Sequence, residues 1–407
     1  MPAPDRTAAR FLDVHVVQSV PFANLNRDDN NSVKTVRYGD TERTRVSSQS
    51  WKRAVREYFQ DSFGEQALRT RRIGARVTRL LQEEHGWPTE LAQRAGQHVA
   101  AGSSIKFETA KDSPVITTNA MVYVPETAVA ELAALAVEHR AELEAAKDIK
   151  KTSDKSVLPK DAVDAILRSR NGVINLFGRM LAEVDDAGVD GAVQVAHALT
   201  THGTDVELDY FSAVDDVTSA WGDTSGSAHM GHAEFSAGVF YRYATVDLAD
   251  LAANLGGDRD AARELAAGFA EAFILSLPRA KKTATAPHTI PDLVHIAVRS
   301  DRPLSYAAAF EQPVASHDDG GYGPASRAAL ARYATAANKL LGRRGTVAAA
   351  WASLEDKDLD GLGTRVDSFP QLIDAAIDAA FTAPTDAATT SAATAPAFTT
   401  VPAGAGV

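Results

Sequence analysis

The stretch "SAGVFYRYATVDL", residues 236–248, decides the fold of this chain. Its run of aromatic and β-branched residues predicts a β-strand. A long helical stretch follows, "DRDAARELAAGFAEAFILSL" at residues 258–277, and then a second strand, "PDLVHIAVRS" at residues 291–300. The C-terminal half of the chain therefore contains a strand, a helix and a strand in that order.

The N-terminal half repeats this order. Alternation in "FLDVHVVQ" (residues 11–18) predicts a strand. A helix is expected from Ser48, because Ser47 or Ser48 can cap its free N–H groups and because its apolar residues recur at helical spacing; these are Trp51, Val55, Tyr58 and Phe59. "SPVITTNAMVYV" (113–124) predicts another strand. Together the two halves indicate an α+β fold, a βαββαβ ferredoxin-like sheet with large insertions. Further helices are expected at 62–85, 126–146 and 161–180.

Composition narrows the function classes. The 407 residues carry a net charge of −11 and no cysteine, which excludes disulfides, thiolate zinc sites and cysteine nucleophiles. No apolar run reaches the roughly 18 residues of a membrane helix, and the N-terminus lacks the apolar core of a secretory signal. We expect a cytoplasmic protein without a membrane partner. The Ala/Thr/Pro-rich tail at 382–407 has the composition of a disordered segment.

One short segment is basic although the whole chain is acidic. Residues 33–59 hold seven Lys or Arg against three Asp or Glu. Within it, "SSQS" at residues 47–50 begins the expected helix, and a helix N-terminus with free N–H groups suits a phosphate. Lys52, Arg53 and Arg56 follow in the first two turns, at the end of the helix where cations do not compensate the helix dipole. The segment indicates an RNA or DNA backbone site, and the alternative is a basic helix face that only meets solvent.

Several segments carry a family resemblance in the same order along the chain. They are "LNRDD" (25–29), "RTRVSSQSWKRAVR" (43–56), "VDGAVQVAHALTTH" (189–202), "DYFSAVDD" (209–216), "GSAHMG" (226–231), "EFSAGVFYRYATVDLADLAANLGG" (234–257) and "RPLSYAAAFEQPV" (302–314). This chain resembles the Cse-type CasC family, the backbone subunits of the type I-E CRISPR surveillance complex Cascade.

The resemblance implies a hand-shaped, non-catalytic subunit without a cofactor. Copies would assemble along a CRISPR RNA, beside other Cascade subunits, and present the guide for pairing with target DNA. By this likeness an RNA-recognition-like palm comprises 10–60, 113–125 and 236–381, helical fingers comprise 61–112 and 126–198, and a protruding thumb hairpin comprises 199–235. The implied RNA-binding residues are Arg27, Lys34, Gln49, Lys52, Arg53, Arg56 and Met180, and the implied thumb residues are Tyr210 and Phe211. The family's fingers are rich in lysine, whereas this chain has Arg69, Arg71, Arg72, Arg76 and Arg79 there.

"VFYRYATV" (239–246) is the nearest approach to the aromatic signature of RNA-recognition modules. We interpret it instead as a strand whose aromatics alternate between core and surface. The lack of a stacking platform agrees with binding through phosphates, which is independent of base sequence.

Three other patterns suggest chemistry. Asp28 and Asp29 could form a metal-dependent endoribonuclease site, although Asp in a loop usually makes turns. His229 and His232 form a H-x-x-H pair without a third metal ligand. Asp356–Asp367, "DKDLDGLGTRVD", has Asp at positions 1, 3 and 5 and Gly at 6, as in a calcium loop, but lacks the Glu at position 12. We interpret this last segment as an incidental acidic loop.

Overall fold

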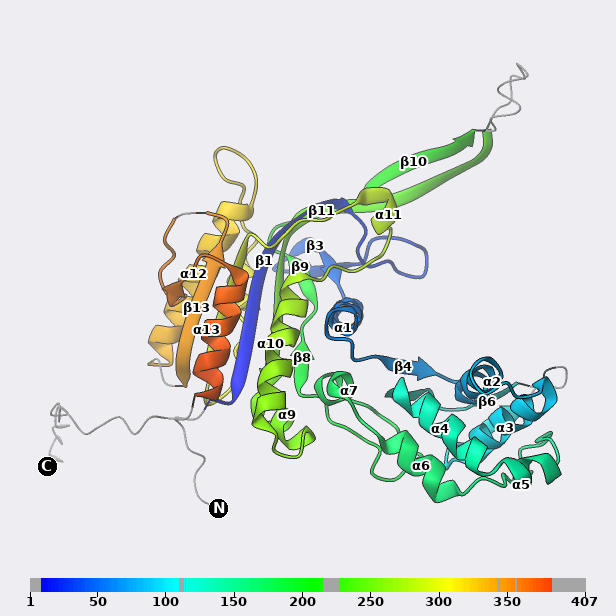
Figure 1. Cartoon of the computed structure of the whole chain (residues 1–407). Coiled ribbons are helices and arrows are strands. Elements are labelled where there is room, and N and C mark those ends of the chain that lie inside the picture. The colour runs from blue at the N-terminus through cyan, green and yellow to red at the C-terminus, as the bar shows by residue number, and fades with distance from the viewer. Residues whose placement is uncertain are drawn as a thin grey trace, which may run out of the picture.

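The computed structural model describes residues 9–382 except 110–112, 114, 215–226, 343–344 and 356. Figure 1 shows three parts: a sheet flanked by helices, a separate lobe of helices, and a long hairpin that extends away from the sheet. The expected tail beyond Thr382 and residues 215–226 of the expected thumb lie outside the described residues. No helix in the described ranges is long and apolar enough to cross a membrane.

The large sheet is centred on two long strands. Its order is β14-β13-β12-β1-β11-β9-β3-β2, and β8 and β10 also pair with β11. β1 lies antiparallel between β11 and β12, with Val14 opposite Ala244 on one side and Ile296 on the other. The bounds are β1 (Phe11–Ala23), β2 (Thr35–Tyr38), β3 (Thr41–Val46), β8 (Val193–Val195), β9 (Ala198–Thr200), β10 (Glu207–Val214), β11 (Ser227–Asp247), β12 (Leu293–Arg299), β13 (Thr346–Ser353) and β14 (Thr364–Arg365).

Helices cover both faces of this sheet. One face packs against α1 (Ser48–Phe63), α10 (Arg259–Leu275) and α13 (Phe369–Phe381), and the other against α12 (Gly323–Leu340) and the 3₁₀-helix η1 (Ala307–Phe310). Side chains alternate across β1, so Leu12, Val14 and Val16 enter the first core and Val17 enters the second. The sequence interpretation of "VFYRYATV" was wrong in one respect, because Tyr241 and Tyr243 are buried beneath η1 and α12 rather than exposed.

The helical lobe has its own core. It contains α2 (Ile73–Glu83), α3 (Thr89–Ala101), α4 (Thr127–Glu138), α5 (Arg140–Ala145) and α6 (Lys160–Arg168). The prediction of one strand at 113–124 was wrong, and so was the assignment of 113–125 to the palm. Two short strands occur there: β6 (Ile116–Thr118) pairs with β5 (Phe107–Thr109), and β7 (Val122–Pro125) pairs with β4 (Ala67–Thr70). Neither joins the large sheet, where β8 and β9 lie beside β11 instead.

Local breaks divide the longer helices expected from periodicity. The helix expected at 62–85 forms only in its second half, as α2, because α1 ends at Phe63 with Gly64 at φ +70° and the chain then forms β4. The helix at 161–180 is α6 and α7 (Gly172–Phe177), and the Asn171 side chain caps α7 by accepting from the Ile174 N–H. The helix at 126–146 is divided at His139 into α4 and α5. The remaining short helices are α9 (Leu248–Asn254) and α11 (Lys282–Thr285).

The hairpin is formed by β10 and the first part of β11. Glu207 lies opposite Phe235 at its base, and Tyr210 lies opposite His232 further out. The segment from 199 to 235 thus contains the projecting hairpin expected there (Figure 1). Tyr210 and Phe211 belong to strand β10 of this hairpin.

A buried polar cluster lies between the sheet and η1. Arg299 donates to Asp13 over 2.9 Å, and the Tyr243 hydroxyl donates to the same carboxylate over 2.9 Å. The His15 ring stacks on Tyr306, with 4.2 Å between ring centroids, and it also stacks on His295. Burial lowers the pKa of His295 to about 4 and that of His15 well below its ordinary value. Both imidazoles are therefore neutral in the folded protein at physiological pH.

This cluster predicts a loss of stability in acid. An unfolded histidine takes up a proton near pH 6.5, whereas folded His295 does not until about pH 4. Unfolding therefore binds protons in this window, and the free energy of unfolding decreases as the pH falls from about 6.5 toward 4, by about 3 kcal/mol for this one residue. The burial of Asp13 raises its pKa and opposes the effect at the acidic end. Urea unfolding at pH 7.5, 6 and 4.5 measures the slope.

His295→Asn is the informative variant. The Nδ1 atom of His295 donates to the Ala350 carbonyl, and an asparagine side chain can make the same hydrogen bond but cannot be protonated. We expect it to be less stable at pH 7.5 but to lose less stability on acidification. His317→Asn, at an exposed position, is the matched control and should keep the slope of the wild type. Equal slopes for His295→Asn and the wild type would contradict the prediction.

Candidate nucleic-acid interface

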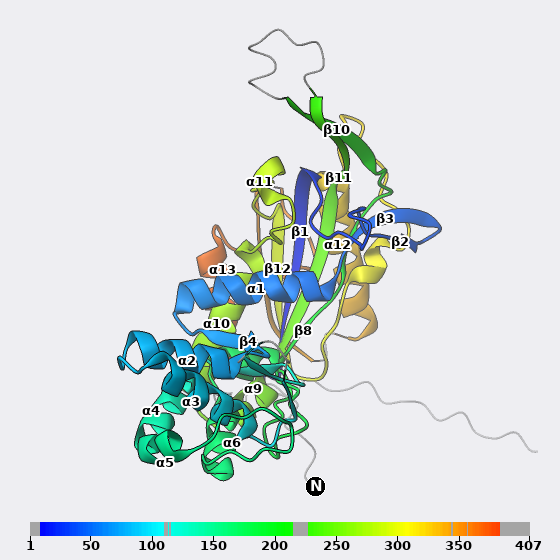
Figure 2. The same ribbon diagram turned by 90° about the vertical axis from the view of Figure 1, so that its right-hand side faces the viewer.

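Helix α1 begins where the sequence predicts, and the structure shows what holds its first turn. The Ser47 side chain accepts from the Ser50 N–H, and the Asn26 side chain accepts from the Ser47 N–H over 2.8 Å. Its buried residues are Trp51, Ala54, Val55, Phe59 and Gln60. Figure 2 shows α1 lying across the sheet, between the hairpin and the helical lobe. Gln49 and Arg53 are exposed on this helix, while Lys52 and Arg56 are half-buried.

The loop between β1 and β2 contains an ordered turn. The Asp28 carboxylate accepts from the N–H groups of Asn30 and Ser32, at 2.8 and 2.9 Å. This geometry is an Asx turn, so Asp28 has a structural role in the loop, and Asp29 is exposed beside it. Arg27 donates to the Asn31 side chain over 3.0 Å.

The same loop is attached to the base of the hairpin. The Glu234 carboxylate accepts from the Ser32 hydroxyl and the Val33 N–H, at 3.0 and 2.9 Å. The backbone of Lys34 pairs with Asn26 and Arg45. These bonds place the loop cations beside the first turn of α1.

Ion pairing separates the cations into two groups. Several expected candidates are paired with carboxylates and exposed: Arg53 with Glu57, Arg71 with Glu108, Arg76 with Glu126, and Arg79 with Glu83. A paired cation must give up its carboxylate partner before it can bind a phosphate. Because the predicted set includes Arg53, its contribution depends on that exchange.

A second group has no ion pair with a carboxylate in the described ranges: Arg27, Lys34, Arg45, Lys52, Arg56 and Arg69. Arg45 lies 3.1 Å from the Nδ1 atom of His197. Burial, and then Arg45 and Lys34, lower the pKa of His197, so positive charges gather at this point without compensation. His197 belongs to "AHAL", and the sequence reasoning did not single it out.

Lys52, Arg56 and Arg69 form the densest part of this group. Burial and the neighbouring charge of Arg69 lower the pKa of Lys52. Burial chiefly lowers the pKa of Arg56, and Arg69 lowers it further. The Arg56 and Arg69 guanidinium carbons lie 6.0 and 4.3 Å from the ring centroid of Tyr123. Three cations from α1 and β4 therefore converge, an arrangement that an anion would stabilise.

Met180 lies next to this convergence and is 92% exposed. It lines an open hollow of about 840 Å³ together with Arg69, Phe177, Gly178 and Asp186. The preceding residue, Arg179, is buried and donates to the carbonyls of Tyr123, Arg168, Ser169 and Ala187. Because these four hydrogen bonds fix the position of Arg179, they also fix the backbone from which the Met180 side chain projects. A large exposed apolar side chain beside unpaired cations suits contact with a nucleotide base.

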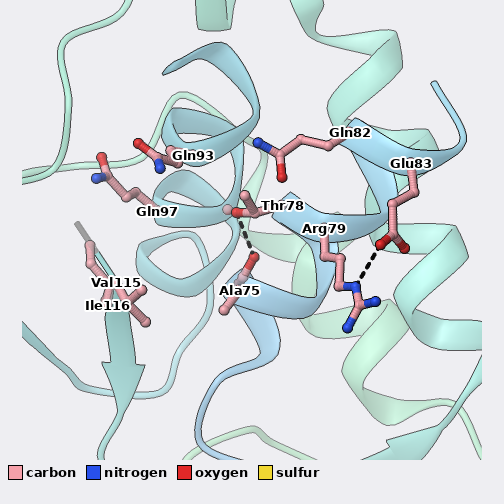
Figure 3. Close-up of a pocket in the computed structure, with 11 residues that line it drawn as sticks. Ala75, Thr78, Arg79, Gln82, Glu83, Gln93, Gln97, Val115 and Ile116 are labelled. Atoms are coloured by element: carbon pink, nitrogen blue, oxygen red, sulfur yellow. Dashed lines mark hydrogen bonds and ion pairs between the residues drawn. The ribbon is translucent and has the colours of Figure 1, made fainter. Parts of the chain in front are cut away.

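The finger arginines face a different environment. Figure 3 shows a pocket between α2 and α3, about 520 Å³ in volume, lined by glutamines and by the paired Arg79 and Glu83. Gly74 and Gly96 allow the two helices to approach closely, since a Cβ at either would meet the other's carbonyl oxygen. Of the five finger arginines, Arg71, Arg76 and Arg79 are paired with carboxylates, whereas Arg69 joins the cations of α1.

The remaining sequence candidates belong to other segments of the fold. His229 and His232 lie in β11. In the 356–367 segment, Asp356 lies outside the described residues, and strand β13 precedes the segment where a calcium-binding EF-hand has a helix. No group of three or more His, Asp or Glu side chains in the described ranges is arranged to hold a metal.

Comparisons with known proteins agree with the sequence resemblance. Residues 12–377 match the CT1975-like protein family. A chain of a solved structure described as "CRISPR RNA-guided surveillance complex, pre-nicking" is 46% identical, with a TM-score of 0.84, over 91% of this chain and 100% of that one. A chain of another "CRISPR RNA-guided surveillance complex" is 41% identical, with a TM-score of 0.74, over 91% and 99%. No curated protein matches.

The family match covers the large sheet, the helical lobe and the hairpin, and the similar solved chains are covered almost from end to end. The chain belongs to the CT1975-like protein family, the CasC-type family that its sequence resembles.

Proposed function

We propose that this protein is a CRISPR RNA-binding scaffold subunit of a type I-E Cascade complex. Copies of it assemble along the guide RNA, in contact with other Cascade subunits, and present the guide for pairing with target DNA. The sheet order β12-β1-β11-β9, with α1 and α10 on one face, supports an RNA-recognition-like palm. The proposed location is the cytoplasm.

The observation that carries this proposal is the row of unpaired cations along the loop, β3 and α1. The chain is strongly acidic, yet these side chains have no carboxylate partner in the described ranges, while other surface arginines do. Phosphate binding by Lys and Arg is independent of sequence, as a scaffold for variable guides requires. The similarity to chains of RNA-guided surveillance complexes supports guide RNA as the anion.

The hairpin supports assembly of copies. Leu208 and Tyr210 lie on the same face of β10, and both are exposed, Tyr210 by 74%. Phe211 is exposed by 51% and its ring lies over Gly231. An exposed apolar surface on a projecting element usually marks an interaction site. We assign it to the neighbouring copy and the RNA between the two.

The double variant Lys52→Ala/Arg56→Ala tests the phosphate site. It should weaken binding to all single-stranded RNA sequences alike. The negative slope of log affinity against log salt concentration should become shallower by about 1.4, since each lost phosphate contact removes about 0.7 on a single strand. Fluorescence anisotropy with three unrelated guide-length RNAs, at salt concentrations from about 50 to about 300 mM, measures both quantities.

Arg71→Ala/Arg79→Ala is the matched control, because it removes two positive charges that are already paired with Glu108 and Glu83. It should change the slope little. A Lys52→Ala/Arg56→Ala protein that retains the slope, or one whose affinity depends strongly on RNA sequence, would refute the assignment.

Tyr210→Ala/Phe211→Ala tests the hairpin. Because both side chains are exposed, the monomer should stay folded by circular dichroism, while size-exclusion chromatography with guide-length RNA should show shortened or no assemblies. Base–aromatic stacking contributes about 1–3 kcal/mol per base, and the loss would recur at each copy. Leu340→Ala, an exposed apolar residue at the end of α12, serves as the control. Full-length assemblies with unchanged RNA affinity would rule out this role.

The proposal assigns no catalytic residue. Wild-type protein incubated with guide RNA, complementary target RNA and Mg²⁺ should leave both RNAs intact. Asp28→Asn should behave in the same way, since an asparagine oxygen can still accept from the N–H groups of Asn30 and Ser32. Cleavage by the wild type that disappears in Asp28→Asn would establish the alternative, an endoribonuclease.

A further inference from the structure

Strand β7 joins the two cores of the protein through one side chain. Val122 and Val124 belong to the core of the helical lobe, whereas Tyr123 belongs to the core beneath the large sheet, which also contains Val55 and Phe59 of α1. The alternation of a β-strand places them on opposite faces. Tyr123 is therefore a finger residue buried in the palm, at 4% exposure.

The Tyr123 ring also contacts cations from both lobes. Arg69 lies directly opposite it in the β4–β7 pairing, and the Arg69 guanidinium is stacked over the ring at 4.3 Å. Arg56 of α1 approaches the same ring at 6.0 Å. Arginine stacks on aromatic faces through its planar guanidinium, which lysine cannot reproduce. The ring thus fixes a finger cation beside the palm cations.

In the described part of the chain, no ion pair neutralises the cations around the ring. Among the described residues, Lys52, Arg56 and Arg69 have no ion pair with a carboxylate, and the Arg56 Nε atom is buried without a hydrogen-bond partner. Arg56 and Arg69 both act on the Tyr123 phenol electrostatically, although burial has the larger effect on its pKa and raises it. Buried polar groups and converging cations are costly unless a ligand satisfies them.

We propose that Tyr123 is the positioning residue of a phosphodiester site shared by palm and fingers. Its ring holds Arg69 next to Lys52 and Arg56, so that one RNA phosphate is bound by both lobes at once. The inference deepens the proposed function and rests on it. It makes Arg69 the finger residue that contacts RNA, and it distinguishes Arg69 from Arg71, Arg76 and Arg79, which are paired with carboxylates.

The experiment measures binding of the full chain to a guide-length RNA as a function of salt, with folding checked by thermal denaturation. Arg69→Gln should reduce the slope of log affinity against log salt by about 0.7. Tyr123→Leu should reduce the affinity severalfold and the slope to a similar extent, and Tyr123→Phe should bind like the wild type. Adding Arg69→Gln to Tyr123→Leu should cause little further loss, because both changes remove the same contact. Arg71→Gln should have little effect.

A second pair of variants applies if Tyr123→Leu does not fold. Arg69→Lys keeps the charge but loses the planar stack on the ring, so it should bind more weakly than the wild type, while Arg71→Lys should not. Two outcomes would overturn the role of Tyr123. One is wild-type affinity for Arg69→Lys, and the other is full additivity of the Arg69→Gln and Tyr123→Leu effects in the double variant. Absence of RNA binding by the wild type would instead overturn the proposed function itself, and this inference with it.

Discussion

The buried guanidinium of Arg242 holds together the elements on which the cation surface depends. It lies on β11, is 1% exposed, and stacks over Trp51 of α1 at 4.0 Å and Phe273 of α10 at 4.8 Å. It donates to the Phe273 carbonyl, at the C-terminal end of α10, and to the Gln18 side chain of β1. No carboxylate pairs with it in the described ranges, and burial lowers its pKa to about 9. Burying a charge is costly. The two hydrogen bonds from its terminal nitrogens and the two ring contacts offset that cost, so Arg242 helps to set the position of α1 against the sheet.

From that position α1 meets the helical lobe. The chain leaves the palm at Gly64 and returns through α7, and the lobe between them has a separate core. Tyr123 connects it to the palm by entering the palm core, and Arg179 donates to four backbone carbonyls around the junction. Because Met180 follows Arg179 directly, the residues that join the lobes also place the exposed apolar side chain beside the unpaired cations.

Electrostatics explains how an acidic protein can bind an anionic polymer. Total charge affects long-range attraction, but the free energy of phosphate binding depends on cations that are not already neutralised. Most exposed arginines of the helical lobe have carboxylate partners, whereas Lys34, Arg45, Lys52, Arg56 and Arg69 have none in the described ranges. The acidic residues are therefore located so that this row of cations remains available.

The local sequence pattern by itself determined three elements. These are the start of α1, with its serine cap and its buried Trp51 and Phe59, the long strand around Arg242, and the helix after that strand. Capping, periodicity and β-propensity act within a few residues, so they can be read from the chain directly. Strand pairing cannot, and residues 116–125 were wrongly assigned to the palm, because pairing is decided between segments distant in sequence. The choice among the basic residues was also beyond the sequence. An arginine can lack a carboxylate partner in the described ranges, as Arg69 does, or be paired, as Arg71 is with Glu108. Which of the two holds depends on the carboxylates that the tertiary structure brings within reach.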